Sequence, residues 1–434
     1  MQRPISPFET TYFRKPATAD ALPLFDVAIY IGSTVTGTID AVRLRAVLAE
    51  LAATHPLLRC RAVEDSSGAL SFIGDDAFVP ALDIVPGGVA GLSAVVDAPP
   101  DWSAGLFRAY LCHDGDQSRV LLAVHHGISD GRSAHALLDE MWRRYTAHTQ
   151  GQGVAVEQRD ALPEATDGFF AATTDQADVL ELCHQLSAAA AAGGLGGIAT
   201  LPPDPDHAEG TGNFGIERIE LTTGETTAFL DAAHGLGVTA NSLLMSCALL
   251  AIRSQLTPSA GALPLMCGYT ADMRSWLSPA ISADVVVNAA FGSAIFAAVE
   301  SDVPAAVLAP QVHAQLHEAI TRRDPVRYLL ARQSISDPAT AAVLATPPSL
   351  LVSNIGAVAA PVLPSGMDLI HTEIFVVGVG MPPTMLVLTQ GGRLAIQLEY
   401  DARVHSPLQM AGVRQALIHA LCAPQSAIRQ EAVR

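Results

Sequence analysis

A pair of histidines at the end of an apolar run is the feature that most constrains this chain. Residues 120–124 read as a buried strand, and His125 and His126 follow it directly. A helical pattern begins after Asp130 and Gly131. Proteins with α/β folds commonly place reactive groups where a strand ends and a helix begins. Because an imidazole can take up and return a proton near neutral pH, this turn is the candidate site.

The rest of the pattern predicts an α/β chain in two halves. The segment 39–54 has apolar residues on one helical face, and 107–112 alternates as a half-buried strand. Alanine-rich, glycine-rich and proline-rich stretches follow one another over residues 187–213, which indicates an exposed linker. We therefore expect an N-terminal lobe at 1–186, a linker at 187–213 and a C-terminal lobe at 214–434, with the site in the cleft between the lobes.

The composition indicates a globular protein that binds neither nucleic acid nor an anionic membrane. Half of the 434 residues are apolar and only 16% are charged, so the chain can bury a sizeable core. A net charge of −18 argues against binding to nucleic acid or to an anionic membrane surface. No apolar stretch reaches the roughly 18 residues of a membrane span, and the N-terminus lacks the apolar core of a signal peptide. We expect a cytoplasmic protein without a transmembrane segment.

Other candidate sites have simpler interpretations. The six cysteines are scattered without a CxxC pair, and Cys267 lies in an apolar run typical of a buried thiol. Adjacent histidines on a strand point to opposite faces, so we expect no bound metal, although a metal-dependent hydrolase stays open as an alternative. The arginines Arg322, Arg323 and Arg327 could dock a phosphopantetheine carrier, but a solvated helix face is the favoured interpretation.

The segment from His125 to Gly131 resembles the HHxxxDG acyltransferase superfamily, which includes chloramphenicol acetyltransferase, condensation domains and polyketide-associated acyltransferases. Other segments similar to the family follow in the expected order along nearly the whole chain: Ser6–Glu9, His55–Arg59, Gly237–Leu244, Asp272–Arg274 and Ser353–Gly356. The length and the free-standing form are most similar to the polyketide-associated phthiocerol dimycocerosyl transferase type. The DFGWG motif of the plant subgroup is absent.

The resemblance implies a two-lobed chloramphenicol-acetyltransferase-like fold, in which each lobe is a mixed sheet flanked by helices. A tunnel would run between the lobes, and a segment between residues 356 and 391 would cross from the second lobe to the first. His126 would be the catalytic base, whereas Asp130 would pair with Arg274 to hold the loop. We expect Gly131 to allow a tight turn into the helix and His125 to pack or hydrogen-bond.

The implied activity is acyl transfer from a phosphopantetheine thioester, on an acyl carrier protein or CoA, to a hydroxyl acceptor. The thioester would be a co-substrate, with no bound cofactor. Ser353 and Asn354 are candidates for contacts with the substrate or the oxyanion. We expect a monomer that uses a polyketide synthase carrier domain or acyl-CoA and a small-molecule or lipid alcohol, in secondary metabolism or lipid biosynthesis. Amide formation with an amine acceptor and a non-catalytic carrier-binding module remain alternatives.

Overall fold

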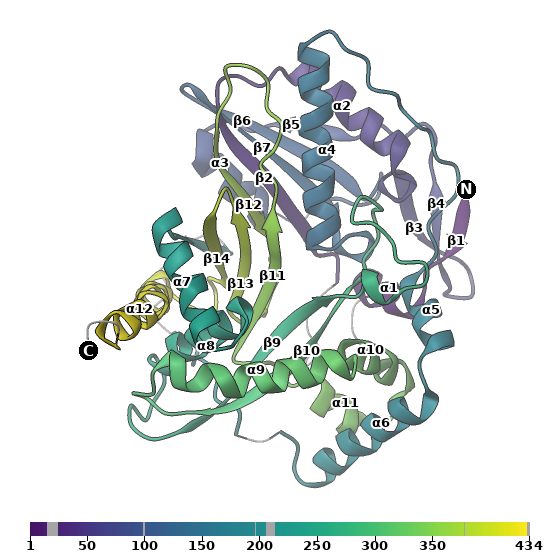
Figure 1. Ribbon diagram of the computed structural model, residues 1–434. Coiled ribbons are helices and arrows are strands. Elements are labelled where there is room, and N and C mark those ends of the chain that lie inside the picture. Colours follow the sequence, from purple (N-terminus) through teal and green to yellow (C-terminus); the bar gives the residue numbers. More distant parts are fainter. Residues whose placement is uncertain (15–24, 99, 196, 205–212, 377, 432–434) are drawn as a thin grey trace.

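The computed structural model describes residues 1–14, 25–98, 100–195, 197–204, 213–376 and 378–431. The first lobe is built on a five-stranded mixed sheet with the order β12-β2-β7-β6-β5 (Figure 1). Its strands are β2 (Ala28–Thr36), β5 (Ala81–Ile84), β6 (Phe107–Asp114), β7 (Gln117–His125) and β12 (Leu369–Phe375). Only the pair of β5 and β6 is parallel.

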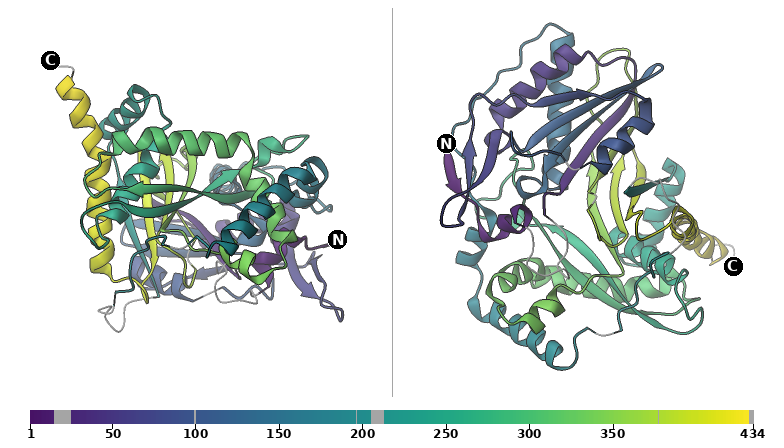
Figure 2. Two further views of the ribbon diagram at one scale, coloured as in Figure 1. Left: turned by 90° about the horizontal axis from the view of Figure 1, so that it is seen from below. Right: turned by 180° about the vertical axis from the view of Figure 1, so that it is seen from behind.

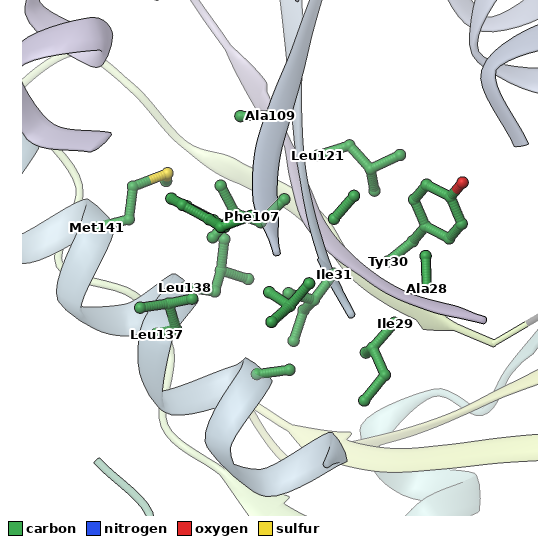
Figure 3. Close-up of a cluster of buried hydrophobic side chains, with 14 of the residues drawn as sticks. Ala28, Ile29, Tyr30, Ile31, Phe107, Ala109, Leu121, Leu137, Leu138 and Met141 are labelled. Carbon is green, nitrogen blue, oxygen red and sulfur yellow. The ribbon is translucent and has the colours of Figure 1, made fainter. Parts of the chain in front are cut away.

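Helices α2 (Ala41–Thr54) and α4 (Gly131–Thr149) pack against each other, and α4 also packs on β2. The apolar face predicted for 39–54 is buried in α2. Figure 3 shows Ile31 of β2 and Phe107 of β6 beside side chains of α4, whereas Tyr30 and Leu121 lie on the other side of the strands. The remaining elements before α4 are α1 (Pro7–Phe13), α3 (Gly88–Asp97) and a small antiparallel sheet of β1 (Gln2–Pro4), β4 (Leu70–Gly74) and β3 (Cys60–Glu64).

The second lobe contains a six-stranded mixed sheet with the order β10-β9-β11-β13-β14-β8. Its strands are β8 (Phe214–Glu220), β9 (Leu263–Asp272), β10 (Ala290–Val299), β11 (Leu350–Val358), β13 (Thr384–Gln390) and β14 (Arg393–Asp401). Its core includes residues of four helices: α7 (Thr223–Gly235), α8 (Ala240–Arg253), α9 (Ala305–Thr321) and α12 (Pro407–Glu431). The two-lobed α/β architecture predicted from the sequence is therefore present (Figure 2).

A third apolar cluster joins helices from both halves of the chain. Helices α5 (Thr166–Thr173) and α6 (Gln176–Ala191) contribute to it together with α10 (Asp324–Ser334) and α11 (Pro338–Leu344). Residues 187–191, the start of the predicted linker, are helical in α6 because alanine is the best helix former. Residues 196 and 205–212 of the predicted linker lie outside the described residues. Helix α6 thus packs on the half of the chain that follows it.

The segment 356–391, where a crossover was expected, contains β12. This strand pairs with β2 of the first sheet, although β11 and β13 on either side of it belong to the second sheet. Its buried Glu373 forms an ion pair with Arg119 of β7, and the backbone N–H of Ile374 donates to Gln397 of β14 at 2.7 Å. Strand β12 is therefore attached to both sheets.

Among the described helices, none is by itself long and apolar enough to cross a membrane; α7 and α8 meet that criterion only as a pair bent by 102°.

Candidate active site

The candidate site forms where β7 ends and α4 begins. His125 is the last residue of β7, and a single 3-10 turn (His126–Ile128) follows it. The backbone N–H of His126 donates to the carbonyl of Val27 at 2.9 Å, which continues the pairing of β7 with the chain before β2. The Asp130 carboxylate caps α4 by accepting from the N–H groups of its first turn. The turn is therefore fixed at both ends.

The hydrogen bond of His126 defines which nitrogen can act as a base. Its Nδ1 lies 2.9 Å from the carbonyl oxygen of Ser129, which can only accept, so Nδ1 carries the proton in the neutral ring. The lone pair is then on Nε2. Desolvation by the surrounding protein lowers the pKa of His126 below its usual 6.5, against the opposing effect of its hydrogen bonds. The side chain is half-buried, and its neutral form can accept a proton.

His125 occupies a different environment. Its side chain is fully buried and stacks on the ring of Phe13, with centroids 4.1 Å apart and planes inclined by 7°. Its Nδ1 accepts from the N–H of Gly127 at 3.0 Å, and Trp102 meets the ring edge-on. Burial lowers the pKa of His125. These contacts favour the packing and hydrogen-bonding role predicted for it.

Asp130 and Arg274 lie together across the lobes. Arg274 Nη1 donates to Asp130 Oδ2 at 2.7 Å, and both side chains are buried. The same carboxylate oxygen accepts from the N–H of Ala289 at 2.8 Å, and Arg274 Nη2 donates to the carbonyl of Val287 at 3.0 Å. The ion pair expected from the resemblance is thus present in the structure, and it attaches the histidine loop to the segment that precedes β10.

The reason for a glycine at position 131 differs from the one expected. Gly131 is the first residue of α4 and is not among the glycines with a left-handed backbone. A Cβ at this position would instead lie only 2.7 Å from Ile355 Cγ2 of β11. The expectation of a tight turn is therefore corrected: Gly131 permits the close approach of a strand from the second lobe.

Two residues at the site were missed by the sequence analysis. Asn288 Nδ2 donates to the carbonyl oxygen of His126 at 3.0 Å. The ring of Tyr12, from α1, lies 4.8 Å from the imidazole between centroids, and the side chain of Asn288 lowers the pKa of its hydroxyl. Burial raises the pKa of Tyr12 to about 12, so the phenol keeps its proton. The only available signal was an isolated asparagine in the apolar run 285–290.

Ser353 and Asn354, the candidates for substrate contacts, lie on β11. The hydroxyl groups of Ser353 and Thr270 are 2.9 Å apart. Asn354 Nδ2 donates to Asn241 at 3.1 Å, and its Oδ1 accepts from the N–H of Gly356 at 2.8 Å. Within the described part of the chain, no hydrogen bond joins either side chain to the imidazole. The amide of Asn354 is already engaged in its own lobe.

The three candidate docking arginines differ in accessibility. Arg327 is buried, and its guanidinium donates to Asp324 at 2.9 Å and to the carbonyl of Asp178. Its assignment to a docking surface is therefore corrected, because this side chain joins α10 to α6. Arg322 is exposed but pairs with Glu318 and Asp324. Arg323 is exposed and lies over the ring of Trp276.

Neither of two small hollows found in the described structure has His126 in its lining. One, of about 10 Å³, lies beside Phe214 and Glu399, and the other is bordered by His135 and Thr372. The tunnel implied by the resemblance therefore stays an expectation. Among the described residues, no group of three His, Cys, Asp or Glu side chains could hold a metal ion. Burial raises the pKa of the Cys267 thiol.

Comparison with known sequences relates the chain to one family. A profile described as the phthiocerol/phthiodiolone dimycocerosyl transferase C-terminus matches residues 210–399. The phthiocerol/phthiodiolone dimycocerosyl transferase of Mycobacterium leprae (strain TN) is 27% identical over 158 residues, which cover 35% of this chain and 36% of that protein. The chain thus spans about a third of the length of this curated relative.

Solved structures establish the fold over nearly the whole chain. Polyketide synthase associated protein 5 from Mycobacterium tuberculosis superposes with a TM-score of 0.72 at 18% identity, covering 96% of this chain and 98% of that one. The TRI3 trichothecene 15-O-acetyltransferase from Fusarium sporotrichioides also gives 0.72, at 11% identity, covering 98% and 95%. The chain has the two-lobed chloramphenicol-acetyltransferase-like fold, and its sequence matches are to the phthiocerol dimycocerosyl transferase type, as the resemblance predicted.

Proposed function

We propose that this protein is an acyltransferase that moves an acyl group from a phosphopantetheine thioester to a hydroxyl acceptor and forms an ester. The observation that carries the proposal is the imidazole of His126. Its Nδ1 is committed to the carbonyl of Ser129, which leaves Nε2 of this half-buried residue free to accept a proton. The relatives named as transferases support the same reaction class.

In the proposed reaction, Nε2 of His126 accepts the proton of the acceptor hydroxyl as its oxygen attacks the thioester carbonyl carbon. A C–O bond forms and a tetrahedral oxyanion results. The oxyanion collapses, the C–S bond breaks, and the imidazolium returns the proton to the departing thiolate. A base of this kind contributes roughly 10²–10⁴-fold in rate, and holding both substrates beside one ring adds to this.

The surrounding residues would keep the ring in position through these proton transfers. The carbonyl of Ser129 can hold the Nδ1 proton in both the neutral and the cationic ring. Asn288 would fix the backbone of His126, and the Asp130–Arg274 pair would fix the start of α4. These groups act through the orientation of the imidazole rather than on the substrate.

The remaining roles are extensions of this proposal. Ser353 is the better of the two candidates for the oxyanion contact, because its hydroxyl can rotate whereas the amide of Asn354 is engaged. The donor would be acyl-CoA or a carrier domain, for which Arg322 and Arg323 are the accessible members of the proposed docking surface.

The test is a product analysis with a matched pair of histidine variants. The wild-type protein, His126→Ala and His234→Ala are incubated with acyl thioesters and either alcohols or amines, and products are identified by mass spectrometry. His234 lies exposed on α7. We expect acceptor-dependent ester formation that falls about 10²–10⁴-fold in His126→Ala and is unchanged in His234→Ala. A correctly folded His126→Ala protein that forms ester at the normal rate would refute the role of the imidazole. Exclusive amide formation would refute the hydroxyl acceptor.

A further inference from the structure

Among the described residues, Arg332 of α10 has no acceptor for a hydrogen bond or an ion pair. Its side chain is half-buried, but no carboxylate or carbonyl in the described part of the chain forms an ion pair or hydrogen bond with it. Every other described arginine with a buried or half-buried side chain has such an acceptor, as Arg274 and Arg327 illustrate. A guanidinium remains charged in proteins. Because none of its nitrogens is among the buried side-chain atoms without a partner, the Arg332 guanidinium keeps contact with solvent and is able to bind an anion.

Helix α10, which carries Arg332, lies close to the candidate base. Helix α10 packs directly on α1 and on β10, as Figure 1 shows. Tyr12 of α1 shares an apolar cluster with Leu329 and Leu330 of α10, and its ring lies 4.8 Å from that of His126. Tyr12 therefore links α10, the helix that carries Arg332, to the imidazole.

Electrostatic effects agree with this placement. Desolvation lowers the pKa of Arg332, whereas its electrostatic interaction with Tyr12 raises this pKa. The positive charge of Arg332 in turn lowers the pKa of Tyr12, by less than desolvation raises it. Because burial keeps Tyr12 protonated, the phenol cannot supply the negative charge that Arg332 lacks. A protein with a net charge of −18 also attracts anions poorly, so a local unpaired cation is needed to hold one near the site.

We propose that Arg332 binds a carboxylate that one of the two substrates carries near its reacting group. The proposal rests on the acyl transfer proposed above and specifies its substrate class. A carboxylate matches the planar fork of a guanidinium with two parallel hydrogen bonds. The carboxylate belongs either to the acyl group or to the acceptor, and these sources are distinguishable. A phosphate of the pantetheine arm is the less suitable ligand, because it lies at the end of the arm remote from the thioester.

The experiment compares substrates that differ only in the carboxylate. Acyl-CoA thioesters with a terminal carboxylate are paired with unsubstituted thioesters of equal length. Hydroxy acids are paired with their methyl esters. We expect one carboxylate-bearing series to have the higher kcat/KM with the wild-type protein. Arg332→Gln should lower kcat/KM for that series about 10- to 100-fold, mostly through KM, as expected for a charge-assisted hydrogen bond. Arg332→Gln should change kcat/KM for the neutral series by less than about 3-fold. Arg332→Lys should restore part of the loss in the carboxylate-bearing series.

A control variant and a binding measurement separate the possible failures. Arg45→Gln removes an exposed arginine of α2 and should leave both series unchanged. The shift in melting temperature is measured with the same hydroxy acids, their methyl esters, free dicarboxylic acids and inorganic phosphate at constant ionic strength. Stabilisation by carboxylates that requires Arg332 would support the anion site even if no thioester is turned over, which would refute only the acyl transfer. Equal losses for both series, a shift with phosphate alone, or no carboxylate effect in either assay would overturn the proposal.

Discussion

The buried pair of Asp130 and Arg274 makes the sharpest prediction about stability. Asp130→Asn retains a side-chain oxygen that can cap α4, because asparagine and aspartate are about equally good N-caps. It removes the charge, however, and places an amide group against either the backbone N–H groups or the guanidinium. Both side chains of the pair are at most 4% exposed. Breaking such a pair leaves an uncompensated buried charge, which costs about 3–5 kcal/mol.

Asp40→Asn is the matched control. Asp40 caps α2 through one oxygen that accepts from two backbone N–H groups, as Asp130 does for α4, but it is exposed and has no ion pair in the described structure. We expect its substitution to change the free energy of unfolding by less than about 0.5 kcal/mol. The two caps therefore differ in the ion pair rather than in the geometry of the helix start.

Urea unfolding followed by far-UV circular dichroism measures both variants, and the slope of each transition is compared with that of the wild type. In the double variant with Arg274→Met, the loss should be smaller than the sum of the single losses, because the unpaired charge is removed. A difference of less than about 1 kcal/mol between Asp130→Asn and Asp40→Asn, or simple additivity in the double variant, would show that the ion pair does not make this contribution.

Three further predictions follow from local contacts. Gly131→Ala should destabilise the protein, because its Cβ would lie 2.7 Å from Ile355. Gly168→Ala in α5 should stabilise the protein by about 0.5–1 kcal/mol, because a Cβ there meets nothing within 4 Å. Melting temperatures that rank the two variants in the reverse order would contradict this prediction. A plot of log kcat/KM against pH should rise with a midpoint below 6.5 and be level near pH 7–8. The reason is that burial lowers the pKa of His126 and that only the neutral imidazole is the base. A midpoint above 6.5 would be inconsistent with a buried imidazole as the base. Burial raises the pKa of Glu140, but an adjacent histidine and arginine outweigh burial and hold the pKa at about 2. The contribution of Glu140 to stability is therefore present above about pH 4.5 and is lost as the pH falls toward 2. Urea midpoints of the wild type and Glu140→Gln should converge over that interval, and a constant difference would argue against the contribution.

The sequence was sufficient where the determinants are local. The alternation over 107–112 appears in β6, and the apolar face within 39–54 is buried in α2. The position of His126 between a strand and a helix follows from the same kind of pattern. The reason for Gly131 could not be found in this way, because it depends on a strand more than two hundred residues later. The burial of Arg327 likewise depends on Asp178 of a distant helix.

The residues that orient the candidate base show why the site could be predicted only in part. His126 belongs to the first lobe, but its carbonyl is held by Asn288 and its loop by Arg274, both from the second half of the chain. The ring also faces Tyr12 of α1, which packs on α10. A motif read from consecutive residues identifies the imidazole but cannot indicate these contacts, which exist only once the lobes pack together. The orientation of the base is therefore a property of the contact between the lobes, and substitutions there should alter turnover without touching the substrate.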